Sequence, residues 1–435
     1  MSNVSLFQTK YTTSENLESL SKKLQEPDWI LKRRKDAFSK FNKLPYDQDT
    51  LFYKYTNFRK LNPEKLTPMW ELEDVINFPE YDQDPTSIEF DASVKINLDI
   101  EMQNKGIIFT SLNNLIKMDE ALAKKIIKKI DGISNNFDKL GLLARAFSSN
   151  TMVLYVPKGV ILDKPITKEI YNSPGPYTSF NEFIAYFEEE TQVEIRETFQ
   201  NNNQSANDDD QIYISMNVFY LKDHANVSHS QIQAWRNNVV HIIAKTVDLD
   251  NYSKITSLSH LQGGQMTRQN SLLNLRGRGS EGYDLFLKFG NDKQRFDVKS
   301  ELRHYGEDTI GQTHARSVMT GKSESILRGL ITIYETAINA DSWLTSKGMT
   351  IGKAKISAIP SLAILQNDVK AAHAASVEPL NENVIFYLET RGIDKKTSKE
   401  MLVKGYFEHI LKLYKKEETS VASRKHLNKK WTTLN

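Results

Sequence analysis

From residue 151 onward, apolar and polar residues alternate with a period of two, which is typical of β-strands that bury one face. The runs that carry this pattern are short and are separated by polar turns: 152–156, 183–187, 193–198, 212–221, 239–247, 255–261, 271–276, 284–289, 295–300, 325–332, 353–359 and 369–375. The alternation stops before a helical pattern begins at Pro379. We therefore predict a mainly β core over residues 151–377.

The segments between these runs indicate how the strands connect. Few of them hold a plausible helix, so an alternating strand–helix architecture is disfavoured. Asn-Gly and Asp-Gly pairs, which favour tight hairpins, are nearly absent from this region. Gly277, Gly279 and Gly282 have strands on both sides, so they indicate a turn and not a dinucleotide-binding loop. A β-solenoid is favoured over a sandwich or barrel, and at roughly 20 residues per coil it would have on the order of ten coils.

The residues before the core read as two segments. Residues 1–75 are helical and polar, with an apolar stripe at Trp29, Ile30, Ala37 and Phe41. Residues 32–35 are all basic, and we interpret them as a solvated helix face. Residues 76–150 form a mixed lead-in, with a strand-like run at 93–101 and helices at 118–130 and 138–147.

A helical period returns in residues 378–435. One short helix ends near Gly392, and Asp394 can cap the start of the next. That helix carries an apolar stripe, of which we expect one part to pack on the preceding helix and the rest to be free for a partner: Leu402, Phe407, Ile410 and Leu413. The tail beyond Tyr414 is basic. We expect it to be solvated and frayed, and we do not expect it to bind nucleic acid.

The composition excludes several kinds of chemical site. Among 435 residues there are 57 Lys and Arg against 55 Asp and Glu, which gives a net charge of +2. This balance does not indicate binding to nucleic acid or to an anionic membrane. The chain has no cysteine, which excludes disulfides, a catalytic thiol and an iron–sulfur cluster held by its own thiolates. The N-terminus lacks the apolar region of a signal peptide, and no apolar run is long enough to span a membrane. We expect a cytoplasmic protein.

Catalytic signatures are missing from the sequence. It contains no phosphate-binding glycine loop, no HExxH and no GxSxG, and its nine histidines are scattered. Asp284, Asp297 and Glu301 could supply the clustered carboxylates of a carbohydrate-active β-helix enzyme. We keep that class as an alternative, although charged residues on the outside of a solenoid are expected in any case.

Four landmarks occur in a fixed order along the chain. They are Glu26-Pro27-Asp28-Trp29 with Arg34, Ala37 and Leu44-Pro45; the stretch 153–160 (VLYVPKGV) followed by Lys164-Pro165-Ile166; the stretch 368–377 (DVKAAHAASV); and Phe386-Tyr387-Leu388 followed by Arg391-Gly392-Ile393. Each landmark is weak alone, but together and in this order they resemble the SufB/SufD family of the SUF iron–sulfur cluster assembly system.

The resemblance implies a right-handed parallel β-helix flanked by helical N- and C-terminal segments. It also implies a non-catalytic scaffold subunit whose C-terminal helices dock a SufC-like ABC-type ATPase. The β-helix would pair with a second β-helical subunit, and a transient iron–sulfur cluster would form at their interface. The residues do not decide whether a flavin binds.

Departures from the family indicate which member this chain resembles. Ala340 stands where SufB carries the thiolate proposed to hold the nascent cluster. In Ala371-Ala372-His373 only the histidine of the SufD-type Cys-Ser-His triplet is kept, and Ala363 replaces a family glutamate. The chain is therefore SufD-like, and its partner would be a Cys-bearing SufB-like paralogue. A homodimer acting without such a partner remains an alternative.

His373 is the candidate residue of the cluster-assembly interface. A neutral imidazole is a competent iron ligand, and a histidine with an ordinary pKa is largely neutral at pH 7. His373 would then share the metal with ligands from the partner. The alternative is a histidine that only hydrogen-bonds across the last coil and closes the subunit interface.

Overall fold

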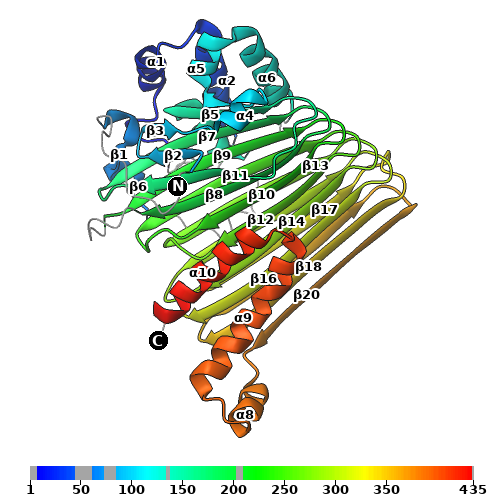
Figure 1. Cartoon of the computed structure of the whole chain (residues 1–435). Helices are drawn as coiled ribbons and strands as arrows, with labels where there is room; N and C mark the ends of the chain where they lie inside the picture. The colour runs from blue at the N-terminus through cyan, green and yellow to red at the C-terminus, as the bar shows by residue number, and fades with distance from the viewer. Residues whose placement is uncertain (1–6, 45–60, 73–84, 134–137, 202–208, 434–435) are drawn as a thin grey trace.

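A computed structural model describes residues 7–44, 61–72, 85–133, 138–201 and 209–433 (Figure 1). It is mainly β, with 45% strand and 29% helix, and it forms a β-solenoid of about 8 turns between N- and C-terminal helices. The predicted fold class is confirmed. Pro45 of the family-like opening motif lies outside the described residues.

The solenoid wall consists of two sheets. Sheet A holds β1 (Thr67–Pro68), β4 (Ile108–Ser111), β5 (Asn150–Val156), β7 (Tyr177–Phe187), β9 (Gln211–Leu221), β11 (Val239–Leu249), β13 (Met266–Leu275), β15 (Arg295–His304), β17 (Glu324–Ile333) and β19 (Lys355–Ile364). Sheet B holds β2 (Ser87–Phe90), β3 (Ser93–Ile96), β6 (Ile166–Asn172), β8 (Gln192–Asn201), β10 (Asn226–Gln233), β12 (Lys254–Leu261), β14 (Glu281–Gly290), β16 (Ile310–Gly321), β18 (Ala340–Gly352) and β20 (Val369–Pro379). From β5 to β20 the chain alternates between the sheets, and each strand pairs in parallel with the strand two further on.

Each coil is longer than predicted. His229 lies opposite Ser257, 28 residues on, and Gly311 lies opposite Ser342, 31 residues on. The predicted coil of 20 residues, and with it the count of ten coils, is therefore wrong. The prediction missed the strands at 166–172, 226–233, 310–321 and 340–352. Their inward positions carry polar residues such as His229 and Ser342, so their apolar alternation is weak.

The turns between the sheets repeat at one corner of the solenoid. Their residues in the left-handed region have φ between 53° and 65°: Glu190, His224, Tyr252, Gly279, Asp308 and Asn339. Each donates its backbone N–H to a carbonyl of the next coil, at 2.8 to 3.1 Å. Successive corners are thus joined by the backbone itself, which explains how the coils turn without hairpin sequences. The prediction of a turn is confirmed for Gly279, but it is wrong for Gly282, which lies within β14 opposite Ile255.

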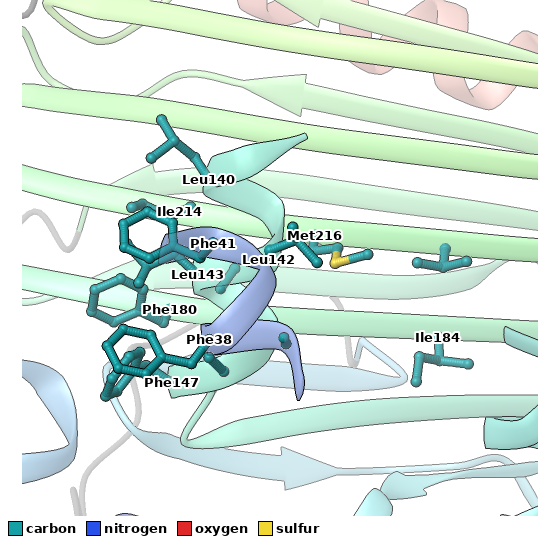
Figure 2. Packing of buried hydrophobic residues seen from close by; sticks show 14 of the residues in the cluster. Phe38, Phe41, Leu140, Leu142, Leu143, Phe147, Phe180, Ile184, Ile214 and Met216 are labelled. Atoms are coloured by element: carbon teal, nitrogen blue, oxygen red, sulfur yellow. The ribbon is translucent and has the colours of Figure 1, made fainter. Parts of the chain in front are cut away.

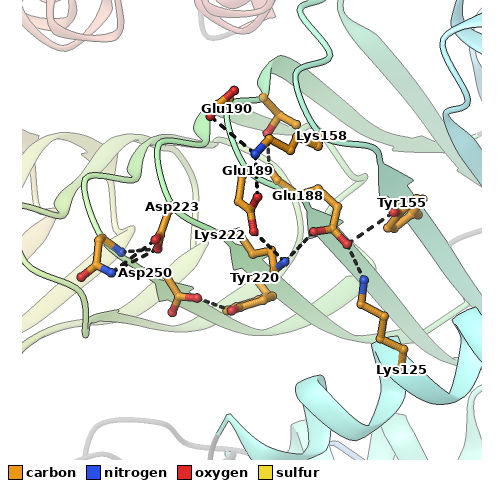
Figure 3. A network of polar contacts seen from close by, with 12 residues as sticks. Lys125, Tyr155, Lys158, Glu188, Glu189, Glu190, Tyr220, Lys222, Asp223 and Asp250 are labelled. Carbon is orange, nitrogen blue, oxygen red and sulfur yellow. Dashed lines mark hydrogen bonds and ion pairs between the residues drawn. The ribbon is translucent and has the colours of Figure 1, made fainter.

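An ion-pair network reinforces the first of these corners (Figure 3). Glu188 accepts hydrogen bonds from Lys125 at 2.5 Å and from Tyr155 at 3.4 Å, and Lys222 lies 2.7 Å from its other oxygen. Lys125 belongs to α6 (Glu120–Gly132), whereas Tyr155, Glu188 and Lys222 come from successive coils. The network therefore fastens an N-terminal helix to the solenoid.

Most of the N-terminal helices cover the outer face of sheet A. They are α1 (Ser14–Lys23), α2 (Asp28–Lys43), α5 (Leu112–Met118), α6 and α7 (Lys139–Phe147). Helix α4 (Ile100–Asn104) instead packs Met102 against the interior of the solenoid, with Leu154 and Ile195. Figure 2 shows Phe38 and Phe41 of α2 packed with Phe147 of α7 and with Phe180 and Ile214 of the sheet. The fold thus buries a large apolar cluster between the helices and sheet A.

A buried ion cluster joins the same elements. Arg33 donates two hydrogen bonds to the Glu182 carboxylate at 2.7 and 2.8 Å, and Arg145 donates a third at 2.8 Å. Burial by itself would raise the pKa of Glu182, but the two guanidinium groups lower it to about 2. Arg34 binds Glu26 and the carbonyls of Ala146 and Ser148. The prediction of a solvated basic face is wrong for both arginines, which are among the buried residues.

The C-terminal helices are α8 (Glu382–Thr390), α9 (Lys395–Tyr414) and α10 (Glu417–Thr433). Asp394 caps α9 by accepting N–H bonds from Lys396 and Thr397, as predicted. Helices α9 and α10 lie along the outer face of sheet B (Figure 1). The prediction of a frayed tail is wrong, because Trp431 is buried and Lys430 donates to Phe289 O at 2.6 Å. None of the described helices is both long and apolar enough to cross a bilayer.

Candidate functional site: the open end of the solenoid

The last coil leaves both sheets open. Strand β19 pairs only with β17, and β20 pairs only with β18, so each lies at the end of its sheet within the described chain. After β20, helix α8 lies beyond the ends of the strands, and α9 and α10 turn back over the outer face of sheet B (Figure 1). A long unpaired edge is a template for pairing with another chain. Two such edges, side by side, make this end a surface for association.

The inner side chains of the last coil are apolar and partly uncovered. Leu362 follows Leu302 and Ile331 along one register row, and both of these are fully buried core residues. In the last coil the same inward direction leads out of the core, and Leu362, Ile364 and Val377 are 37%, 43% and 45% exposed. The hydrophobic interior therefore ends without a cap among the described residues. Covering it would bury apolar area, which favours association.

His373 lies in this opening. It follows an inward register row of sheet B that consists of His229, Ser257, Asp284, Thr313 and Leu344. The members before it are buried, whereas His373 is exposed because no coil covers it. It is the only ionisable residue at an inward position of β19 or β20. The sequence prediction thus falls on the one titratable side chain at the centre of the open end.

Behind His373 the interior contains a chain of buried polar groups that the sequence analysis missed. Lys168 lies 3.2 Å from Glu89 and 3.1 Å from Glu197, whose other oxygen lies 2.8 Å from His229. Burial would raise the pKa of Glu197, but the Lys168 ammonium and His229 lower it to about 2. Burial lowers the pKa of His229 in spite of this carboxylate.

The chain continues through the next coils. His229 lies 3.2 Å from Ser257, to which Lys245 donates at 2.6 Å. Lys245 also binds Asp284 at 2.9 Å, and Ser300 donates to the other Asp284 oxygen at 2.7 Å. In the sequence, the only sign of this buried chain is that ionic and polar residues recur at alternate strand positions. A solvent-exposed outer face gives the same pattern, so the sequence could not distinguish the two.

Leu344 separates this polar chain from His373. A Cβ on Gly329 would lie 1.8 Å from Leu344 Cδ1, so the leucine side chain occupies the space that Gly329 leaves. Thr313, within 3.0 Å of Ser300, is the last polar member, and Leu344 follows it in the register row. His373 therefore belongs to the open surface and not to the buried network.

The carboxylates of the carbohydrate-active alternative do not share a face. Asp284 points into the solenoid and pairs with Lys245. Asp297 and Glu301 alternate with the inward residues Val298 and Ser300, so they lie on the outside of sheet A, where they pair with Arg328 and Arg303. The wall of the solenoid separates the groups, and the geometry does not support a pair of catalytic carboxylates.

The predicted ATPase-docking stripe faces largely inward. Phe407 and Ile410 are 1% and 0% exposed, in a core cluster with Leu285, Leu287 and Phe289 of sheet B. Leu402 and Leu413 are partly buried against the same cluster. Most of the stripe is therefore buried against sheet B and is not free for a partner. The sequence could not show this packing. The apolar side chains left exposed on α8 and α9 are others: Val384, Phe386, Tyr387 and Met401.

Comparison with known proteins relates the chain to one family. A family model described as the SufBD core domain of SUF system FeS cluster assembly matches residues 170–406. The chain belongs to the SufBD family. It is 26% identical over 428 residues to the iron–sulfur cluster assembly protein SufD of Bacillus subtilis, covering 94% of this chain and 97% of that protein. SufBD family proteins of Staphylococcus haemolyticus and Staphylococcus epidermidis are 23% and 24% identical over 431 residues, covering 94% of this chain and 91% of each relative.

This SufD-like member of the SufBD family is an iron–sulfur cluster assembly protein. The two positions at which the resemblance pointed to lost thiols lie on the inner face of the last two strands of sheet B. Ala340 begins β18 and is buried beneath Val369 of the last coil. Ala371 lies on β20 opposite Ser342, two residues before His373. No three His, Cys, Asp or Glu side chains of the described chain form a group that could hold a metal ion.

Proposed function

We propose that this SufBD protein is a scaffold subunit that pairs, through its open end, with a Cys-bearing β-solenoid paralogue of the SufB type. The main support is the structure of the last coil, which combines two unpaired strand edges with an uncapped apolar interior. A second solenoid end offers the same two features, so the edges could pair and the interiors could close against each other. The role is structural and needs no catalysis by this chain.

In our proposal the nascent cluster is assembled where the two solenoid ends meet. Stable clusters generally need several thiolates, and this chain has none, so the thiolates would come from the partner. In this proposal His373 adds an imidazole ligand or accepts a proton at the same point. The chain alone would then not retain a cluster after anaerobic reconstitution with iron and sulfide.

Parallel reconstitutions test this role. The chain is co-expressed with the Cys-bearing paralogue as wild type, His373→Ala or His224→Ala, the last being an exposed histidine on a corner turn. We measure the mass of the complex by size exclusion with light scattering, together with its iron and sulfide content. We expect an intact complex with a severe loss of cluster only for His373→Ala, because one hydrogen bond contributes only about 0.5–1.5 kcal/mol to association.

Two results would contradict the proposal. Wild-type iron content in the His373→Ala complex would return His373 to a packing role. Failure of the chain to co-purify with the paralogue, together with a stable dimer of its own, would favour the homodimer alternative instead.

A SufC-like ABC-type ATPase is the second partner that we propose, docking on α8 and α9. The support is the exposed apolar surface formed by Phe386, Tyr387 and Met401, which are 68%, 55% and 50% exposed. A truncation before α8 is a poor test, because it would uncover the core residues beneath α9. We expect Phe386→Asp with Tyr387→Asp to abolish ATPase pull-down, whereas Val421→Asp, on exposed α10 surface, should not. Retention by the double variant would place the docking site elsewhere.

A further inference from the structure

A groove lies on the outer face of sheet B, beside the end of α9. Its cavity volume is about 260 Å³, and it is lined by side chains of β8, β10, β12, β14 and β16 and by residues 413–416. It is separate from the open end, because its floor is formed by earlier coils. The floor follows one outward register row, in which Ser228, Thr256, Tyr283 and Gln312 succeed one another.

The floor offers free hydrogen-bonding groups. In the part of the chain that the structure describes, the Ser228 and Thr256 hydroxyls have no hydrogen-bond partner, and both side chains are half-buried. Tyr283 forms part of the wall and donates its hydroxyl to Glu281 at 3.0 Å. A ligand in the groove could therefore bond to two adjacent hydroxyls without breaking an existing contact.

Lysines surround the groove, and they are not fully neutralised. Lys254 is paired with Glu281 at 2.7 Å. Lys416 lies only within 3.9 Å of Glu194, and that carboxylate also accepts from Thr419 at 2.8 Å. Lys415 has no ion-pair partner among the described residues. The C-terminal end of α9 adds partial negative charge, which a full ammonium charge outweighs.

Arg316 adds positive charge along the face beneath α9. His314 lines the groove but adds none, because burial and the charges of His409 and Arg316 lower the pKa of its imidazole to about 4. Arg316 lies next to Lys347 in the register, and neither forms an ion pair with a carboxylate of the described residues. Lys415 beside the groove, with Arg316 and Lys347 further along the face, thus carries positive charge that no carboxylate of the described residues pairs with, which favours an anion in the groove.

We propose that this groove binds a small anion that carries phosphate or carboxylate groups. Lys415 and Lys416 contact the charged groups, and the Ser228 and Thr256 hydroxyls fix their orientation. Hydroxyl and ammonium groups donate hydrogen bonds to phosphate and to carboxylate oxygens alike, so the same residues would bind either kind of anion. The proposal does not depend on the pairing of the open end.

The test is calorimetric titration of the full chain with pyrophosphate and, separately, with citrate. We expect at least one probe to bind with a Kd of about 1 mM or tighter at low ionic strength. Lys415→Ala with Lys416→Ala should weaken that binding by about tenfold or more, as should Ser228→Ala with Thr256→Val. Lys412→Ala, on exposed surface of the same helix, is the matched control and should bind as the wild type does.

Three outcomes would overturn the proposal. The first is the absence of binding by either probe up to about 10 mM, the range of very weak affinities. The second is an equal loss of binding in Lys412→Ala. The third is a loss in the lysine variant with full binding by the hydroxyl variant, since that pattern indicates diffuse attraction to surface lysines. Circular dichroism of each variant confirms that it is folded before titration.

Discussion

Replacement of Glu182 by glutamine tests how the N-terminal helices are held on the solenoid. The Glu182 carboxylate has no solvent exposure and receives three hydrogen bonds from Arg33 and Arg145. Glutamine keeps the shape of the side chain but removes its charge. The two buried guanidinium groups would lose this carboxylate and keep the ion pairs with Asp131, whose side chain is 34% exposed.

The expected loss is about 3 kcal/mol of the free energy of unfolding at neutral pH. A pKa lowered from 4.5 to about 2 corresponds to a contribution of about 3 kcal/mol above pH 4.5. Breaking a buried ion pair costs about 3–5 kcal/mol, which agrees. Because the folded-state pKa is the lower one, this contribution is lost as the pH falls from 4.5 toward 2. The difference between wild type and variant should therefore shrink to about 1 kcal/mol at pH 3.

Urea unfolding, followed by circular dichroism at pH 7 and pH 3, measures both values. Glu101→Gln is the control, because Glu101 pairs with Lys105 at 2.9 Å on the surface, where its side chain is 60% exposed. That change should cost no more than about 0.5 kcal/mol. A loss below about 1 kcal/mol for Glu182→Gln at pH 7, or a difference that does not shrink at pH 3, would refute the reasoning.

Three further variants probe the solenoid by the same unfolding assay. Asp284→Asn leaves the buried Lys245 ammonium without its counter-charge and should cost about 3–5 kcal/mol; an unchanged stability would show that the pair is dispensable. Gly329→Ala places a Cβ 1.8 Å from Leu344 Cδ1 and should cost about 1–3 kcal/mol; a second change, Leu344→Ala, should remove that penalty in a double-mutant cycle. His373→Ala should change stability by less than about 0.5 kcal/mol, since the side chain is exposed, and a larger loss would reveal a structural role.

The alternation of apolar and polar residues was enough to predict a solenoid, but not its coils. Strands such as β9 are mostly apolar and could be recognised, whereas β10 buries His229, Ser230 and Gln231. Strands with polar inward residues do not show in a hydrophobic pattern. The coil length was consequently too short. Local signals fared better: Asp394 was predicted as a helix cap because capping depends only on neighbouring residues.

Long-range partners explain the remaining differences. Arg33 and Arg34 read as solvated because their partners, Glu182 and Ser148, are far away in the sequence. The stripe of Phe407 and Ile410 was predicted correctly as apolar, but the sequence could not show that sheet B would cover it. His373 was selected by family resemblance, and only the register shows that it stands alone at the open end.

Because the coils are stacked in a single row, the stability of the fold depends mainly on the contacts between neighbouring coils. Each coil contacts mainly the coil before and after it, so the stability of a coil depends on having two neighbours. The last coil has one, and we expect local unfolding to begin there and to proceed toward the N-terminal helices. A partner that binds this end supplies the missing neighbour and stabilises the fold by mass action. Assembly and folding are thus linked, and we expect unassembled subunits to be trimmed by proteases from β20 backwards.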